Sequence, residues 1–234
     1  MNFNGSASEQ NVTSATPPFV TREPDRYQAT RIITFTESAP SGTPLAPRIN
    51  RVLIARDGEK RREEYSAGAS EQIVYLEIPA GRFILLPASS LYADLNTAAD
   101  ETALSDRLDE SLSLSPDQLL NEAHAPATYE KLGAEMLDGR MTTKYRTIVI
   151  ARTADQDETL IWIDEVLGMP VRSETIFSTS ERSSKLTMEL KDVKLEVDAL
   201  LFTWPPDYKK VEARLIFDLM RKAANLEGPK QDER

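Results

Sequence analysis

The stretch that decides the fold is TLIWIDEVLGMPVRSE, residues 159–174. It predicts one strand, a tight connection and a second strand that returns antiparallel. Apolar residues follow one another from Leu160 to Ile163, so both faces of the first strand are apolar near its middle. Gly168 and Pro170 mark the turn, because glycine permits a positive φ, whereas proline fixes φ and ends the strand pairing. We therefore expect a β-hairpin here, with Trp162 on its first strand.

The strand pattern continues on both sides of this hairpin. Alternating or β-branched residues fill 27–36, 51–56, 60–66, 72–78, 83–87, 129–136, 141–152, 185–190 and 193–201. Asp57-Gly58 and Asp138-Gly139 are two-residue hairpin signals. Charges occupy nearly every position of 60–66, which predicts a strand that lies near the sheet edge or faces solvent. Strands separated by short turns favour an antiparallel meander over βαβ units.

Two segments predict helices. Leucines and acidic residues recur at helical spacing in 98–125, where Ser115-Pro116-Asp117 supplies an N-cap, a proline at the first helical position and a first-turn acid. Residues 211–226 carry the clearest apolar stripe of the chain, made of Val211, Leu215, Ile216, Leu219, Met220 and Ala223. Both helices need an apolar surface to cover, and the dry face of a curved sheet provides one.

The domain organisation follows from these patterns. Residues 1–18 are polar and are expected to be a flexible leader. Residues 19–210 form one β domain with the helical insert 98–125. Residues 211–234 form a C-terminal amphipathic helix and a tail.

Composition excludes several function classes. The net charge of −10 argues against nonspecific binding to nucleic acid or to anionic membranes. The chain has no cysteine, and His124 is its one histidine, so cysteine nucleophiles and zinc sites with two His or Cys ligands are excluded. No G-x-S-x-G elbow and no glycine-rich phosphate loop is present. We therefore expect no enzyme, no metal and no cofactor, and we interpret His124 as a loop residue.

Acidic pairs are a further kind of candidate site. Asp164-Glu165 and Glu63-Glu64 could hold calcium or act in general acid–base catalysis, but the sequence has no recognisable calcium loop. We interpret these pairs as solvated turn charges. No apolar run of about 18 residues exists, so we expect no membrane span.

Three groups of residues resemble a known family. They are Tyr129-Glu130-Lys131-Leu132-Gly133-x-Glu135 with Asp138-Gly139-Arg140, Trp162-Ile163-Asp164 with Gly168-Met169-Pro170, and Phe202-x-x-Pro205-x-x-Tyr208. Over residues 27–208 the chain resembles the LolA/LolB-like lipoprotein carriers. The resemblance implies an α+β fold, an unclosed antiparallel half-barrel with helices covering its concave face. This chain departs from the carriers before the first strand, where the carriers have a helix and this sequence is interrupted by Pro17, Pro18 and Pro24.

The resemblance also implies a function. We expect an extracytoplasmic, non-catalytic carrier or sensor for an acyl chain, lipid or lipoprotein, peripheral to the membrane. The predicted ligand-binding residues are Phe83, Leu85, Trp162, Met188, Leu195 and Val197. The alternative is an envelope interaction module whose hollow is filled by its own helices and whose partner is a protein. A periplasmic location implies a signal or anchor that Met1 replaces in this sequence, and a cytoplasmic location is the alternative.

Overall fold

The computed structural model describes residues 13–14, 18–19, 22–39, 41–67, 71–96, 127–150, 156–178, 183–204 and 206–226. The chain divides into two compact units. Unit 1 comprises residues 1–24, 33–48 and 114–189, and unit 2 comprises residues 25–32, 49–113 and 190–234. Each unit is built from three separate pieces of chain, and three of the five boundaries between them fall inside strands.

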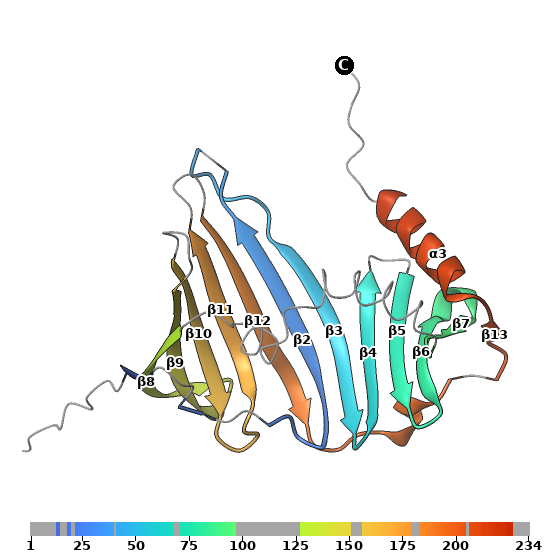
Figure 1. Cartoon of the computed structure of the whole chain (residues 1–234), viewed down its shortest axis with the longest axis horizontal. Helices are drawn as coiled ribbons and strands as arrows, with labels where there is room; N and C mark the ends of the chain where they lie inside the picture. Colours follow the sequence, from blue (N-terminus) through green and yellow to red (C-terminus); the bar gives the residue numbers. More distant parts are fainter. Residues whose placement is uncertain are drawn as a thin grey trace, which may run out of the picture. The chain divides into compact units, whose positions relative to one another are not determined.

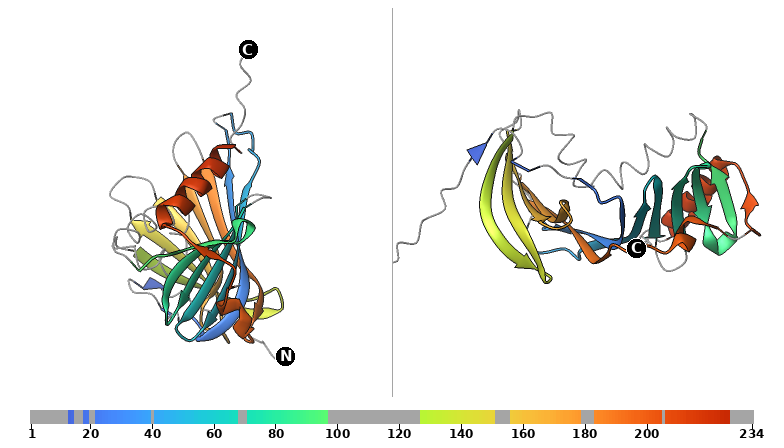
Figure 2. Two further views of the ribbon diagram at one scale, coloured as in Figure 1. Left: turned by 90° about the vertical axis from the view of Figure 1, so that its right-hand side faces the viewer. Right: turned by 90° about the horizontal axis from the view of Figure 1, so that it is seen from below.

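Unit 1 is a series of antiparallel strands. In hydrogen-bonded order they are β1 (Thr13–Ser14), β8 (Ala127–Leu137), β9 (Arg140–Ile150), β10 (Gln156–Asp164), β11 (Pro170–Ser178) and β12 (Ser183–Lys194), followed by the second half of β2 (Arg26–Glu37). The register of β8 shifts between Lys131 and Gly133, where Gly133 has a φ of 119°. Bulges of this kind bend a strand, and Figure 2 shows β8 and β9 curving along their length.

The β10–β11 hairpin confirms the prediction made from residues 159–174. Leu160 pairs with Glu174 and Trp162 with Arg172. Gly168 has a φ of 69°, as expected of the turn glycine. The prediction for Pro170 was wrong, because Pro170 opens β11 and pairs with Ile163. Proline suits the first residue of a strand, where no ladder hydrogen bond needs its missing N–H.

Unit 2 contains the remaining strands. The first half of β2 is followed in the hydrogen-bonded order by β3 (Arg48–Asp57), β4 (Lys60–Ala67), β5 (Glu71–Ile78), β6 (Gly81–Leu86), β7 (Leu91–Asp94) and β13 (Lys209–Lys210). The ladders from β3 to β7 are antiparallel, and β13 joins β7 in parallel. Two short 3-10 helices, η1 (Pro87–Ser89) and η2 (Ala199–Phe202), connect strands of this unit.

Helix α3 (Ala213–Leu226) lies beside β6 and β7 in unit 2 (Figure 1). Its buried face is formed by Ala213, Ile216 and Phe217, whereas Leu215 is 46% exposed. The helix predicted at 211–226 is therefore confirmed, with Leu215 on its outer side. The other predicted helical segment, 98–125, and His124 with it, lie outside the described residues.

Two strand predictions were wrong. Strand β4 is not at an edge, because it pairs with β3 on one side and β5 on the other. Its charges are accommodated by ion pairs: Arg31 of β2 with Glu63, and Arg62 with Glu64 two residues further along β4 itself. The strand predicted at 193–201 ends at Lys194, because Asp198 caps η2 by accepting a hydrogen bond from the Leu200 amide at 2.9 Å.

The predicted fold class, an α+β fold dominated by one large antiparallel sheet, is confirmed. The order of the described strands begins with β1 and ends with β13, so these ladders do not close on themselves. Within the described part of the chain, no helix is both long and apolar enough to cross a bilayer.

Candidate functional site

One face of unit 1 is apolar over neighbouring strands. Directly paired residues of antiparallel strands share a face, so the register places Ser173 with Met188 and Thr175 with Leu186. Ile33, Leu186 and Met188 form a buried cluster, against which the half-buried Phe35 and Phe177 pack. We call these five residues the Met188 face. Met188, a predicted ligand-binding residue, is 2% exposed at its centre.

The same side of the sheet continues into β10 and β9. Ile161 pairs with Tyr145 on one side and with Ser173 on the other. Tyr145, Ile161 and Ile163 form a second cluster, which Phe19 covers from the chain before β2. The Phe19 ring centroid lies 4.7 Å from that of Tyr145. The apolar side of unit 1 therefore extends over β9, β10, β11, β12 and β2.

Trp162 lies on the opposite face of unit 1. It pairs with Lys144 and Arg172, and both cations stack on its indole, at 4.6 and 5.2 Å from the ring centroid. The indole N–H donates to a carboxylate oxygen of Glu135. These contacts bury Trp162 to 4% exposure within a charged network. The structure thus does not bring Trp162 together with Met188.

Three other predicted ligand-binding residues gather in unit 2. Phe83, Leu85 and Val197 belong to one cluster with Ala55, Val74, Leu76 and Phe202. Trp204 packs on this cluster with its ring centroid 4.8 Å from that of Phe83. The chain's own segment from Val197 to Trp204 therefore packs over Phe83 and Leu85. Leu195, the sixth predicted residue, is 53% exposed. The role of all six residues as a ligand wall stays a prediction.

A small cavity adjoins this cluster on the same face. It measures about 290 Å³, at the lower end of the range for ligand pockets. Its lining combines Leu53, Ala55 and Leu201 with the ion pair of Arg62 and Glu64, whose closest atoms are 2.8 Å apart. The Arg62 guanidinium also donates to the carbonyl of Leu201 at 3.2 Å, which holds η2 against the sheet.

The other face of unit 2 changes from apolar to charged along its strands. Ladder register gives three successive rows: Val52, Tyr65 and Ile73; then Ile54, Glu63, Tyr75 and Ile84; then Arg56, Arg61, Glu77 and Arg82. The third row lies beside the β3–β4 and β5–β6 turns. We call this face the graded face.

The middle row holds a buried polar group. The Arg31 guanidinium on β2 donates to Glu63 at 3.2 Å, and the Tyr65 hydroxyl donates to the same carboxylate oxygen. Burial, together with the neighbouring Glu63 charge, raises the pKa of Tyr65 far above its ordinary value. The Arg31 side chain is 9% exposed, and its Nε finds no hydrogen-bond partner in the described structure.

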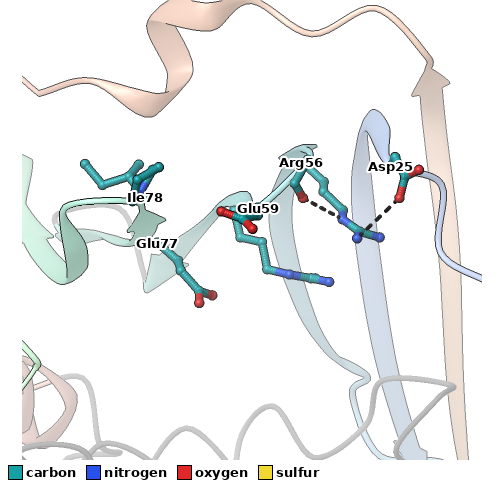
Figure 3. A pocket seen from close by; sticks show the side chains of 8 residues that line it. Asp25, Arg56, Glu59, Glu77 and Ile78 are labelled. Atoms are coloured by element: carbon teal, nitrogen blue, oxygen red, sulfur yellow. Dashed lines mark hydrogen bonds and ion pairs between the residues drawn. The ribbon is translucent and has the colours of Figure 1, made fainter.

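A second cavity of about 590 Å³ lies at the charged end of this face (Figure 3). We call it the turn pocket. It is lined by Asp25, Arg56, Gly58, Glu59, Arg61, Glu77, Ile78 and Pro79. The Arg56 guanidinium lies 3.6 Å from a carboxylate oxygen of Asp25 and donates to the Gly58 carbonyl at 3.2 Å. The Gly58 amide in turn donates to the Asp25 carbonyl at 2.7 Å, which ties the start of β2 to the hairpin.

The structure corrects the prediction for Asp164. This residue is 1% exposed instead of solvated. One carboxylate oxygen accepts hydrogen bonds from the Val166 and Leu167 amides at 2.8 Å, and the other accepts one from Arg140 at 3.0 Å. Asp164 therefore stabilises the β10–β11 turn through these hydrogen bonds. Across the described ranges, no three His, Cys, Asp or Glu side chains are grouped to hold a metal ion.

The turn pocket could not be predicted from one motif. Its arginines and acids come from β3, β4 and β5, from the β3–β4 turn and from Asp25 just before β2. One signal was present: Arg56 and Arg61 flank the hairpin turn symmetrically, so a two-residue turn places them opposite each other.

Comparisons with known proteins concern the fold. No family model and no curated protein matches the sequence. The chain is similar to the lipoprotein LppX of Mycobacterium tuberculosis, at 15% identity over 73% of this chain and 89% of that chain, with a TM-score of 0.35. It is similar to a LolA superfamily protein of Nitrosomonas europaea, at 15% identity over 79% and 92%, with a TM-score of 0.31.

A third similar structure is the MucA/MucB complex of Pseudomonas aeruginosa, at 15% identity over 80% of this chain and 58% of that chain, with a TM-score of 0.39. Since these three TM-scores are below 0.5, the likenesses assign no function to this chain.

Proposed function

We propose that the protein is a non-catalytic binding protein for a hydrophobic molecule, an acyl chain, lipid or lipoprotein, and that it acts outside the cytoplasm as a carrier or sensor. The observation that carries the proposal is the Met188 face, where aliphatic and aromatic side chains line one side of β11, β12 and β2.

Two features of this face support an apolar occupant. Polar side chains next to it are small and uncharged: Ser173 and Thr175 lie beside Met188 and Leu186 in the register. In contrast, the opposite face of the same strands carries Arg172, Glu174 and Glu189 in a network of ion pairs. An apolar ligand placed on the Met188 face would therefore meet no charge from the paired stretches of β11 and β12, and its burial there would be favourable.

The first test is native mass spectrometry of the purified protein, followed by organic extraction and lipid analysis. A stoichiometric adduct that yields an acyl chain on extraction is the expected result. A protein that shows only its own mass, and still does so after incubation with fatty acids and phospholipids, would contradict the proposal and leave the protein-interaction alternative.

A pair of neighbouring variants locates the site. Phe177 is a half-buried member of the Met188 face, whereas Ile176 is 37% exposed on the other side of the same strand. We expect Phe177→Gln to lower lipid retention and Ile176→Gln to leave it unchanged. Equal retention by the two folded variants would exclude the Met188 face as the site.

A further inference from the structure

The rows of the graded face differ in polarity in a regular way. The first row pairs Val52 with Tyr65 and Tyr65 with Ile73, all buried. Two residues further along each strand, about 7 Å away, the row contains Glu63 and Tyr75. A further two residues bring Arg56, Arg61 and Glu77 to the turn pocket. One end of the face is thus buried and mostly apolar, and the other end is charged.

The charged row places two like charges side by side. Arg56 and Arg61 are directly paired across β3 and β4. Like charges that face each other across an antiparallel ladder repel and destabilise the sheet. Asp25 lies 3.6 Å from Arg56 and offsets part of this repulsion. An anionic group bound between the two arginines would offset more of it, with charge-assisted hydrogen bonds.

The turn pocket also holds negative charge. Three carboxylates, from Asp25, Glu59 and Glu77, accompany the two guanidiniums of Arg56 and Arg61. Glu59 lies in the β3–β4 turn and is exposed, and Glu77 is paired with Arg61 in the ladder. A ligand carrying only negative charge would be repelled by the three carboxylates. A ligand with one negative and one positive group could pair its negative group with the arginines and its positive group with the carboxylates.

We propose that the turn pocket binds the zwitterionic head group of an amphiphile, with its phosphate at Arg56 and Arg61 and its ammonium group at Glu59 and Glu77. The proposal builds on the proposed function and specifies its ligand class. The pocket volume of about 590 Å³ falls within the range for small-molecule sites.

The test compares lysolipids that share one acyl chain. The delipidated full-length protein is titrated with lysophosphatidylcholine, with lysophosphatidic acid and with the uncharged monoacylglycerol, all below their critical micelle concentrations, by isothermal calorimetry. We expect the zwitterionic lipid to bind about tenfold more tightly than the uncharged one, which corresponds to one good charge-assisted contact. We also expect it to bind more tightly than the anionic lipid.

Variants assign the preference to the turn pocket. Arg61→Gln should bring the affinities for lysophosphatidylcholine and monoacylglycerol close together. Glu77→Gln should instead move the preference toward lysophosphatidic acid. Arg51→Gln is the matched control, since Arg51 is an exposed arginine of the same hairpin outside the pocket lining, and it should keep the wild-type ratio. Circular dichroism checks that each variant is folded.

The outcomes separate the two proposals. Equal affinities for all three lipids, or a ratio that Arg61→Gln does not change in a folded protein, would overturn the head-group site and leave the proposed function intact. Tighter binding of lysophosphatidic acid by the wild type would overturn the zwitterionic assignment. Binding of none of the lipids would overturn both proposals.

Discussion

At the scale of single residues, Asp164 shows where sequence interpretation stops. An Asp-Glu pair beside a glycine turn has the composition of a solvated turn, and Glu165 is indeed exposed. Asp164 can be buried because Arg140, 24 residues earlier in the sequence, donates a hydrogen bond to its carboxylate at 3.0 Å. The sequence gives no measure of that distance, so the buried role of Asp164 could not be predicted.

Replacing Asp164 should be costly. Asp164→Ala removes the acceptor for the Val166 and Leu167 amides and the partner of Arg140. We expect a loss of about 3 kcal/mol in the free energy of unfolding, measured by urea denaturation. The neighbouring Glu165→Ala should cost less than about 0.5 kcal/mol. Similar losses for the two variants would contradict the role assigned to Asp164.

The raised pKa of Tyr65 predicts that the free energy of unfolding depends on pH in the alkaline range. Burial and the Glu63 charge raise its pKa above the ordinary value of about 10. The folded protein therefore keeps the phenolic proton at pH values where the unfolded chain loses it, so the unfolded state binds fewer protons and stability falls as the pH rises above about 10. We expect Tyr65→Phe to lessen this fall, as measured by urea denaturation between pH 8 and 11. An unchanged slope would argue against a raised pKa.

At the scale of elements, the strands were the most predictable feature. Alternating residues and the turn glycines located the β8–β9 and β10–β11 hairpins, because both signals are local. The strand predicted after Lys194 was wrong, although Leu195, Val197 and Leu201 alternate as in a strand. Asp198 overrides that pattern through one cap hydrogen bond, and η2 then packs on the sheet.

The η2 segment offers a matched pair of variants. Phe202 is 4% exposed within the cluster of Val74, Leu76 and Phe83, whereas Leu200 is 72% exposed. We expect Phe202→Ala to lower the free energy of unfolding by about 3–5 kcal/mol through the cavity it leaves, and Leu200→Ala by less than about 0.5 kcal/mol. Thermal or chemical denaturation measures both losses. A large loss for Leu200→Ala would contradict the exposed position of Leu200 in η2.

At the scale of the whole molecule, the order of the strands was beyond sequence reasoning. Local hairpin signals predict which consecutive strands pair, but β2 and β12 are neighbours although their nearest ends, Glu37 and Ser183, are 146 residues apart. Nothing local marks that pairing. The six predicted ligand-binding residues were chosen without it, and they are accordingly spread over both units and over both faces of the sheet.

Because each unit is assembled from separate pieces, a contiguous fragment should not fold. Residues 25–113 contain β3 to β7 but lack Val197, Phe202 and Trp204, which complete the apolar cluster of unit 2. We expect this fragment to show no cooperative thermal transition, and a peptide of residues 190–226 to restore one. A cooperative transition of the fragment alone, followed by circular dichroism, would contradict this expectation.

The pairing of β2 with β12 also means that β2 is synthesised long before its partner strand. Ribosomes add about 5–20 residues per second, so roughly 7–30 s separate the completion of β2 from the appearance of its partner strand. Throughout that interval, one side of β2 has its hydrogen-bonding groups and the apolar Ile33 and Phe35 without their final neighbours. An unpaired strand edge of this kind is a template for aggregation. The growing chain therefore has its greatest need of a chaperone before residue 183 emerges, and a pause in translation after β2 would lower the yield of folded protein.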